Sequence, residues 1–232
     1  MHIAPLKASC VWVFDLDNTL HNAVPHVFPH ISRAMTAYLQ SHLELNEEGA
    51  NRLRVHYWQR YGATLLGLRR HHPQIDPQHF LWHTHQFPQL SSMLVYERGL
   101  YGMLRKLPGK KILFSNAPEH YAKSVLLAMG LKDLFADVFC VERTGFRPKP
   151  AAHGFRQLLR EHGIRPQTAI MVEDDLDNLR TAKRLGMRTV WVTSASKSPP
   201  FVDAKVKSIL QLRRTFNTAI SGEFQPGGKH GG

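Results

Sequence analysis

Short runs of apolar residues, each ending abruptly at polar ones, punctuate the chain. Such runs cover 11–14, 112–114, 169–172 and 189–192. Because bulky β-formers follow one another instead of alternating with polar residues, these runs predict strands buried on both faces, as in a parallel sheet. Helical patterns follow the second and third runs, beginning near Pro118 and Leu176. The hydrophobic pattern therefore predicts an α/β protein.

The first apolar run ends in two carboxylates, Asp15 and Asp17, one residue apart. Ligands of open α/β sheets bind beyond the carboxyl ends of the strands, which is where both side chains would lie. Two carboxylates so close repel each other unless a cation or a shared proton offsets their charge, and oxygen ligands suit Mg²⁺. The alternative is a strand followed by an acidic turn, with Asn18 and Thr19 as ordinary turn formers.

Three later segments bring further polar groups to strand ends. Ser115 and Asn116 follow the second run, and the serine hydroxyl could hold an anion. Lys149 lies between two prolines, which fix the local backbone, and a lysine held in this way suits a phosphate. The acidic residues 173–175 follow the third run. These segments place an anion-binding group and more carboxylates near the first pair.

Each segment also has a purely structural interpretation. The Ser-Asn pair could cap a helix, Lys149 could be a solvated loop charge, and residues 173–175 could complement a helix N-terminus. The order of the pieces favours a common site, because DxDxT, Ser-Asn, Lys-Pro and EDD succeed one another along the chain.

These four segments resemble the motifs of the haloacid dehalogenase-like (HAD) hydrolase superfamily. The matching stretches are FDLDNTL (14–20), FSNA (114–117), RPKP (147–150) and VEDD (172–175). Within the superfamily, residues 172–192 and 61–68 look like the pyrimidine 5'-nucleotidase group. The resemblance implies a three-layer α/β sandwich with a mostly parallel, Rossmann-like sheet and an inserted helical cap.

The chain between the first two motifs is long enough to hold such a cap. We predict helices from Pro29, from Asn46 through Leu65, and over about 77–87, followed by a core helix over 96–107. The predicted division is a core of residues 1–20 and 96–214, a cap of residues 21–95, and a flexible C-terminal tail of residues 215–232. A cap placed there would close over the site and exclude water.

The resemblance implies hydrolysis of a phosphomonoester through an aspartyl-phosphate. Asp15 would be the nucleophile, and Asp17 would protonate the leaving group and then deprotonate the attacking water. Mg²⁺ would bind a carboxylate oxygen of Asp15, the main-chain carbonyl of Asp17 and the carboxylate of Asp174. The two catalytic residues are thus also predicted metal ligands.

The phosphate itself would be bound by Ser115, Asn116 and Lys149, which compensate its charge. The sequence leaves open whether Glu173 and Asp175 bind the metal through water or support its ligands. It also leaves open whether the Thr19 hydroxyl orients Asp17 or begins a helix.

The substrate is predicted from the same resemblance. Dehalogenation is not expected, because the dehalogenase branch lacks the acid/base that Asp17 supplies. We predict a small phosphorylated metabolite, a nucleoside 5'-monophosphate such as UMP or CMP, contacted by cap residues among Trp58, Arg60, Tyr61 and Thr64. Packing within the cap is the alternative role of these residues. A phosphatase of sugar or cofactor phosphates, or a phosphotransferase or phosphomutase, would share every motif.

The net charge of +12 raises nucleic-acid binding as a rival class. The charge is dispersed and no RRM, zinc-finger or arginine-rich motif accompanies it, so we expect no nucleic-acid partner. The chain has no apolar run of membrane-spanning length, and its first ten residues lack the apolar core of a secretory signal. We therefore expect no membrane association, a cytoplasmic location, and buried free thiols at Cys10 and Cys140.

Overall fold

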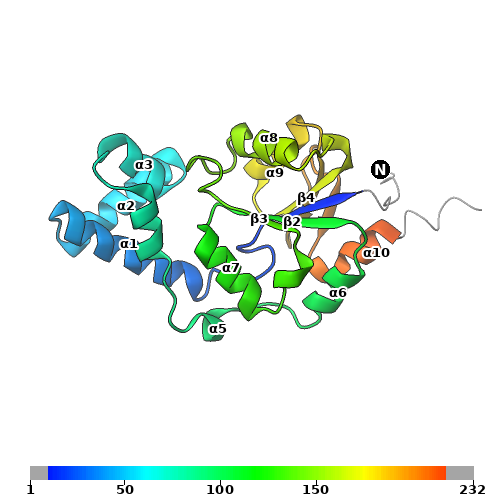
Figure 1. Ribbon diagram of the computed structural model, residues 1–232, viewed down its shortest axis with the longest axis horizontal. Coiled ribbons are helices and arrows are strands. Elements are labelled where there is room, and N and C mark those ends of the chain that lie inside the picture. The colour runs from blue at the N-terminus through cyan, green and yellow to red at the C-terminus, as the bar shows by residue number, and fades with distance from the viewer. Residues whose placement is uncertain (1–9, 218–232) are drawn as a thin grey trace, which may run out of the picture.

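The computed structural model of the protein describes residues 10–217. Its centre is a parallel sheet in the order β3-β2-β1-β4-β5-β6 (Figure 1). The strands are β1 (Val11–Phe14), β2 (Lys110–Phe114), β3 (Asp137–Phe139), β4 (Ala169–Glu173), β5 (Arg188–Val192) and β6 (Ala204–Val206). The predicted α/β fold with a parallel sheet is confirmed.

Helices cover both faces of the sheet, as Figure 1 shows. Trp12 and Phe14 of β1 face a cluster built with helices α6 (Leu100–Lys106), α7 (Glu119–Ala128) and α10 (Leu212–Asn217). Val11 and Val13 face the opposite cluster, built with α8 (Ala152–Glu161) and α9 (Leu176–Arg184). Alternate residues of one strand thus enter two cores, which is why every residue of β1 is apolar.

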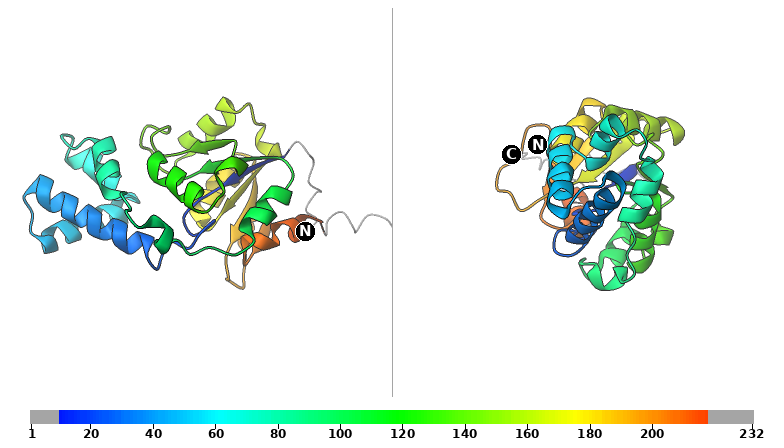
Figure 2. Two further views of the ribbon diagram at one scale, coloured as in Figure 1. Left: turned by 60° about the horizontal axis from the view of Figure 1, so that its bottom comes forward. Right: turned by 90° about the vertical axis from the view of Figure 1, so that its left-hand side faces the viewer.

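A group of helices between β1 and β2 packs mainly on itself. These helices are α1 (Val27–Leu43), α2 (Glu47–Tyr61), α3 (Thr64–His71) and α4 (Pro77–Thr84), and their buried side chains form a third cluster. They stand beside the sheet in the left-hand view of Figure 2. The short helix α5 (Leu90–Met93) instead places Leu90 in the core cluster with α7. The cap of residues 21–95 stays a prediction. Helix α5 lies within that range but packs on the core.

Three predicted helix boundaries are wrong. The helix expected from Asn46 through Leu65 ends at Tyr61, because Gly62 adopts φ 83° and caps α2 by donating its N–H to the Trp58 carbonyl. The expected helix over 96–107 begins only at Leu100, after Gly99 with φ 91°. The helix expected to reach residue 87 ends at Thr84.

The predicted tail also begins too early. Thr215 and Phe216 belong to α10, and the Phe216 ring is 1% exposed, edge-on to Trp12 with ring centroids 5.2 Å apart. Residues 218–232 of the predicted tail lie outside the described residues. Cys10 and Cys140 are buried and free, as predicted. No helix in the described part of the chain combines the length and apolar character needed to cross a membrane.

Candidate active site

The strand ends converge because neighbouring parallel strands stop at the same level. Phe14 at the end of β1 pairs with Leu113 of β2 and with Val172 of β4. Asp15 and Glu173 therefore leave adjacent strands at one edge of the sheet, and the Asp15 N–H donates to the Val172 carbonyl at 3.0 Å. The predicted meeting of these segments is confirmed.

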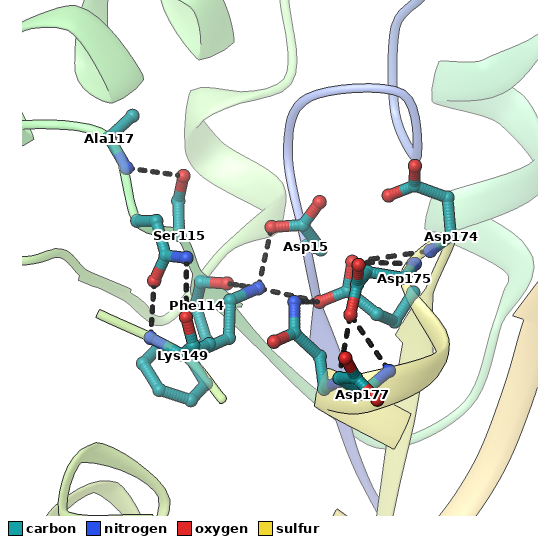
Figure 3. A network of polar contacts seen from close by, with 11 residues as sticks. Asp15, Phe114, Ser115, Ala117, Lys149, Asp174, Asp175 and Asp177 are labelled. Carbon is teal, nitrogen blue, oxygen red and sulfur yellow. Dashed lines mark hydrogen bonds and ion pairs between the residues drawn. The ribbon is translucent and has the colours of Figure 1, made fainter. Parts of the chain in front are cut away.

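Lys149 reaches this edge from the loop that precedes α8 (Figure 3). Its buried ammonium donates to Asp15 Oδ1 at 2.7 Å, to Glu173 Oε2 at 2.6 Å and to the Phe114 carbonyl at 2.9 Å. Burial alone would lower the pKa of Lys149, but the charges of Asp15 and Glu173 outweigh it and hold the pKa above its usual value. The lysine therefore stays protonated, with all three hydrogens in use.

Glu173 organises the loop that follows β4. Its Oε1 accepts the N–H groups of the next two residues, while Oε2 accepts from Lys149 and from the Asn178 amide at 3.0 Å. Asp175 caps α9 by accepting the N–H groups of Asp177 and Asn178, both at 2.9 Å. Glu173 and Asp175 thus shape the loop, which favours a supporting role over a direct metal contact.

Asp15, Glu173 and Asp174 form a cluster in which each residue offers one carboxylate oxygen, and these three oxygens lie within 4.8 Å of one another. Burial, reinforced by the charge of Glu173, raises the pKa of Asp15 to about 8. Burial and the charge of Asp15 raise the pKa of Asp174 to about 6. Lys149 offsets one of three neighbouring negative charges, so the residues present fit a divalent cation with oxygen ligands. The sequence-predicted ligands Asp15 and Asp174 meet here, and the Asp17 carbonyl contact stays a prediction.

Asn116, predicted to bind phosphate, holds the backbone of Lys149. Its Oδ1 accepts the Lys149 N–H at 2.7 Å, and its Nδ2 donates to the Lys149 carbonyl at 3.1 Å. The buried Ser115 Oγ accepts the Ala117 N–H at 3.0 Å, which leaves its own hydrogen to donate. Phosphate contacts of both residues stay predictions, but the clamp gives Asn116 a role that the sequence does not reveal.

Asp17 is held by two buried side chains that the sequence analysis missed. Its Oδ1 accepts the Tyr121 hydroxyl at 2.8 Å and lies 2.9 Å from His21 Nε2. His21 follows Asp17 by four residues, so a tight turn after β1 could have suggested it. Tyr121 is 104 residues away and gives no sequence signal. Thr19 takes neither expected role: no helix begins there, and its buried hydroxyl has no partner among residues 10–217.

The cap residues that we predict to contact the substrate differ in whether their side chains already have partners within the cap. The Thr64 hydroxyl is buried and donates to the Arg54 carbonyl at 3.2 Å, so it is used within the cap. The Tyr61 hydroxyl lies 2.6 Å from His71 Nε2. Trp58 is 60% exposed. Thr64 is therefore the weakest of the four candidates, and the exposed Trp58 keeps a ring surface free for a ligand.

A core loop contacts the cap directly. Arg69 of α3 donates to the carbonyls of Gly145 at 3.0 Å and Phe146 at 2.9 Å, and its guanidinium lies 5.9 Å from the Phe146 ring centroid. Val141, from the same loop, is buried in the cap cluster. This loop leads into Lys149, so the cap is tied to the segment that carries the buried lysine.

Comparisons with known proteins agree with this geometry. A family model described as haloacid dehalogenase-like hydrolase matches residues 11–186. The chain is 27% identical over 199 residues to Phosphate metabolism protein 8 of Saccharomyces cerevisiae, a match covering 79% of the chain and 61% of the yeast protein. It is 25% identical over 211 residues to Phosphoglycolate phosphatase of Pseudomonas putida, covering 85% of the chain and 74% of that protein. The crystal structure of a HAD phosphatase from Thermococcus onnurineus has the same fold, with a TM-score of 0.65 and 20% identity over 92% of this chain and 98% of that one.

Proposed function

Since this chain belongs to the haloacid dehalogenase-like hydrolase family, we propose that it is a metal-dependent phosphatase of small phosphomonoesters. The observation that carries the proposal is the buried pair of Asp15 and Lys149, with Asp174 beside it and Asp17 two residues along the chain. The pair offers a carboxylate nucleophile and a fixed positive charge at one point, which is what phosphoryl transfer needs.

Asp15 attacks the phosphorus atom in the first step. Lys149 occupies Oδ1 of Asp15, which leaves Oδ2 to form the new O–P bond. As that bond forms, the bond from phosphorus to the leaving oxygen breaks, and Asp17 donates its proton to that oxygen. In the second step Asp17 removes a proton from water, which attacks phosphorus, releases inorganic phosphate and restores Asp15.

Negative charge accumulates where Asp15 meets the phosphate, so the surrounding positive charge determines the barrier. Lys149 supplies one fixed charge, and Asn116 fixes the backbone that carries it. A divalent cation bound by Asp15 and Asp174, for which we propose Mg²⁺, would offset the remaining charge and polarise the phosphate. Ser115 keeps a hydrogen to donate to a phosphate oxygen.

We propose a nucleoside 5'-monophosphate with a pyrimidine base as the preferred substrate. The resemblance of residues 61–68 and 172–192 to pyrimidine 5'-nucleotidases and the exposed ring of Trp58 support it. A second candidate is a small non-nucleotide phosphate, which the likeness to Phosphoglycolate phosphatase favours. The two classes differ in the leaving group, which the cap would contact.

A substrate panel tests the proposal. Phosphate release with Mg²⁺ is measured for UMP, CMP, AMP, phosphoglycolate, a hexose phosphate and pyridoxal phosphate, with Asp15→Asn as the blank. We expect turnover by the wild type alone and the highest kcat/KM for UMP or CMP. A tenfold or greater preference for a non-nucleotide phosphate would replace the nucleotidase assignment and keep the phosphatase. Phosphate transfer to an added sugar in place of water would identify a phosphotransferase.

A further inference from the structure

One oxygen of the Asp17 carboxylate is saturated and the other is free. Oδ1 accepts from Tyr121 at 2.8 Å and lies 2.9 Å from His21 Nε2, while Oδ2 has no hydrogen-bond partner among residues 10–217. His21 is 3% exposed and Tyr121 is 1% exposed. Both partners therefore hold the carboxylate from the protein interior and leave Oδ2 available to a substrate.

A tight turn after β1 brings His21 back to Asp17. Asn18 adopts the left-handed conformation with φ 62°, which asparagine tolerates better than most residues. Its side chain accepts the Ala23 N–H at 3.1 Å, and the Leu20 N–H donates to the Leu16 carbonyl at 2.9 Å. The turn closes with an isolated β-bridge between Asp17 and His21. The backbone thus fixes the imidazole against the carboxylate.

The hydrogen-bond inventory of His21 assigns its ring hydrogen. Nδ1 is buried and has no partner in the described part of the chain, whereas Nε2 faces a carboxylate oxygen. A neutral imidazole has one donor nitrogen and one acceptor nitrogen. A hydrogen on Nε2 is accepted by Asp17, whereas a hydrogen on Nδ1 would be buried without an acceptor. His21 therefore donates to Asp17 Oδ1.

Tyr121 holds the same oxygen from α7. Its ring packs against Phe87, with centroids 5.1 Å apart, and against His85, with centroids 5.8 Å apart, so the ring is fixed by the segment that returns from the cap. Its hydroxyl lies 2.8 Å from Asp17 Oδ1 and donates to it, because a carboxylate oxygen can only accept.

We propose that His21 and Tyr121 are positioning residues for Asp17, which fix Oδ1 and present Oδ2 to the leaving group and then to water. This inference rests on the proposed phosphatase function. Neither residue touches the reacting atoms. Each acts by restricting rotation of the Asp17 carboxylate, because a misplacement of even 1 Å slows proton transfer strongly.

The test compares two aryl esters with Tyr121→Phe, which removes only the hydroxyl. p-Nitrophenolate is a weak base and leaves with little protonation, whereas phenolate is a stronger base and needs the proton from Asp17. Phosphorylation of Asp15 by p-nitrophenyl phosphate should therefore survive, while activation of water by Asp17 becomes slow. We expect a larger stopped-flow burst of p-nitrophenol relative to the steady-state rate than in the wild type. With phenyl phosphate we expect a loss of turnover on the order of tenfold to hundredfold, without a larger burst.

His21 is tested with a matched pair of variants. His21→Gln keeps an N–H donor at a similar reach, whereas His21→Phe keeps a ring and removes the donor. We expect Gln to restore most of the phenyl phosphate activity that Phe loses. The control is Tyr57→Phe in the cap, which removes the hydroxyl of another buried tyrosine, 3.0 Å from His72 Nε2. This control should keep the wild-type ratio between the two esters and the wild-type burst.

The outcomes separate this inference from the function on which it rests. If the wild type hydrolyses neither ester, the phosphatase proposal is wrong and the inference falls with it. If the wild type is active but Tyr121→Phe slows both esters equally without a larger burst, the hydroxyl supports only the fold and the inference is overturned. The same conclusion follows if His21→Gln and His21→Phe lose equal activity at equal thermal stability.

Discussion

Asn116 and Lys149 are 33 residues apart in sequence, yet the Asn116 amide forms two hydrogen bonds with the main chain of Lys149. The first joins the Lys149 N–H to Oδ1 at 2.7 Å, and the second joins Nδ2 to the Lys149 carbonyl at 3.1 Å. Phe114 and Asn116 thus hold opposite parts of the same lysine, since the Phe114 carbonyl accepts from its ammonium. The end of β2 therefore determines where this charge lies.

Asn116→Ala should impair catalysis although Lys149 is still present. The lysine loop loses both hydrogen bonds, so its ammonium no longer approaches Asp15 in one fixed geometry. We expect kcat to fall by about tenfold to a hundredfold, which is the loss of rate expected when a charged group of the active site is displaced. Steady-state kinetics check this, and Asn178→Ala, which removes an amide from the buried Glu173 instead, is the comparison variant. Wild-type kcat for Asn116→Ala would show that the clamp does not position Lys149.

Asp15→Asn should abolish turnover without unfolding the protein. The amide oxygen still accepts from Lys149, but the amide cannot form the phosphoenzyme. Because burial disfavours the charged form of Asp15, as its raised pKa indicates, we expect thermal stability without metal to be equal to or higher than that of the wild type. Phosphate release and calorimetry check both parts. Residual activity within tenfold of the wild type would contradict the covalent mechanism.

The predictable part of the fold is the part determined by burial on two faces. Residues of β1 are apolar at every position because Trp12 and Val13 enter opposite cores, and this pattern is visible in the sequence. β3 escaped prediction because it is short and begins with Asp137, whose side chain pairs with charged neighbours. Phe216 was assigned to a tail because only the packed fold supplies the Trp12 ring that it covers.

The candidate site, like the fold, could be predicted from the sequence only in part. Asp15, Lys149 and Asp174 could be placed together from the motifs, because parallel strand ends must meet at one edge. The partners of Asp17 could not, because Tyr121 reaches it only after α7 packs on the sheet. The clamp by Asn116 depends likewise on the path of a distant loop. Sequence indicates which groups react, whereas packing decides which groups hold them.

Metal binding should be measurable apart from activity. Mg²⁺ bound by Asp15 and Asp174 would relieve repulsion within the cluster of three carboxylates, two of them buried, so it should raise the thermal unfolding temperature in a concentration-dependent way. EDTA should abolish both this increase and turnover. Asp174→Asn should remove the increase, whereas Asp175→Asn, at a residue that caps α9, should retain it. An equal Mg²⁺ response in the wild type and Asp174→Asn would exclude Asp174 as a ligand.

Asp137 should make stability depend on pH. Burial alone would raise its pKa, but hydrogen bonds from Arg143 at 2.5 Å and with His162 at 2.8 Å outweigh burial and lower the pKa. A lowered folded-state pKa stabilises the fold above the unfolded value, and this contribution is lost as the pH falls through the folded value. Asp137→Asn should therefore lose about 1 kcal/mol at neutral pH and progressively less as the pH falls below about 4 towards the lowered folded-state pKa.

Urea unfolding across pH measures this difference. Glu48→Gln is the control, because its ion pair with Arg52 is exposed and should contribute little at any pH. If Asp137→Asn lowers the free energy of unfolding by the same amount at every pH, the shape of the Asp137 side chain, and not its charge, stabilises the fold.

Arg69 should connect the cap to the lysine loop. Its guanidinium donates to the carbonyls of Gly145 and Phe146, and Phe146 adopts φ 58°, a conformation that its bulky side chain disfavours. Without Arg69 both carbonyls lose a charged donor and the loop loses its tie to α3. Because this loop leads into Lys149 while the cap would cover the substrate, Arg69→Ala should raise KM and lower kcat together.

We expect kcat/KM of Arg69→Ala to fall by about tenfold, the range set by two charge-assisted hydrogen bonds in a partly exposed site. Arg69→Lys should recover only part of it, because an ammonium lacks the forked donors of a guanidinium. Arg70→Ala is the control, since Arg70 lies 5.8 Å from the Tyr61 ring centroid within the cap. Wild-type kinetics of Arg69→Ala would show that catalysis does not depend on the contact between α3 and the loop. A fall in kcat/KM in the Arg69 variants alone would show that the cap, as well as Asn116, positions Lys149.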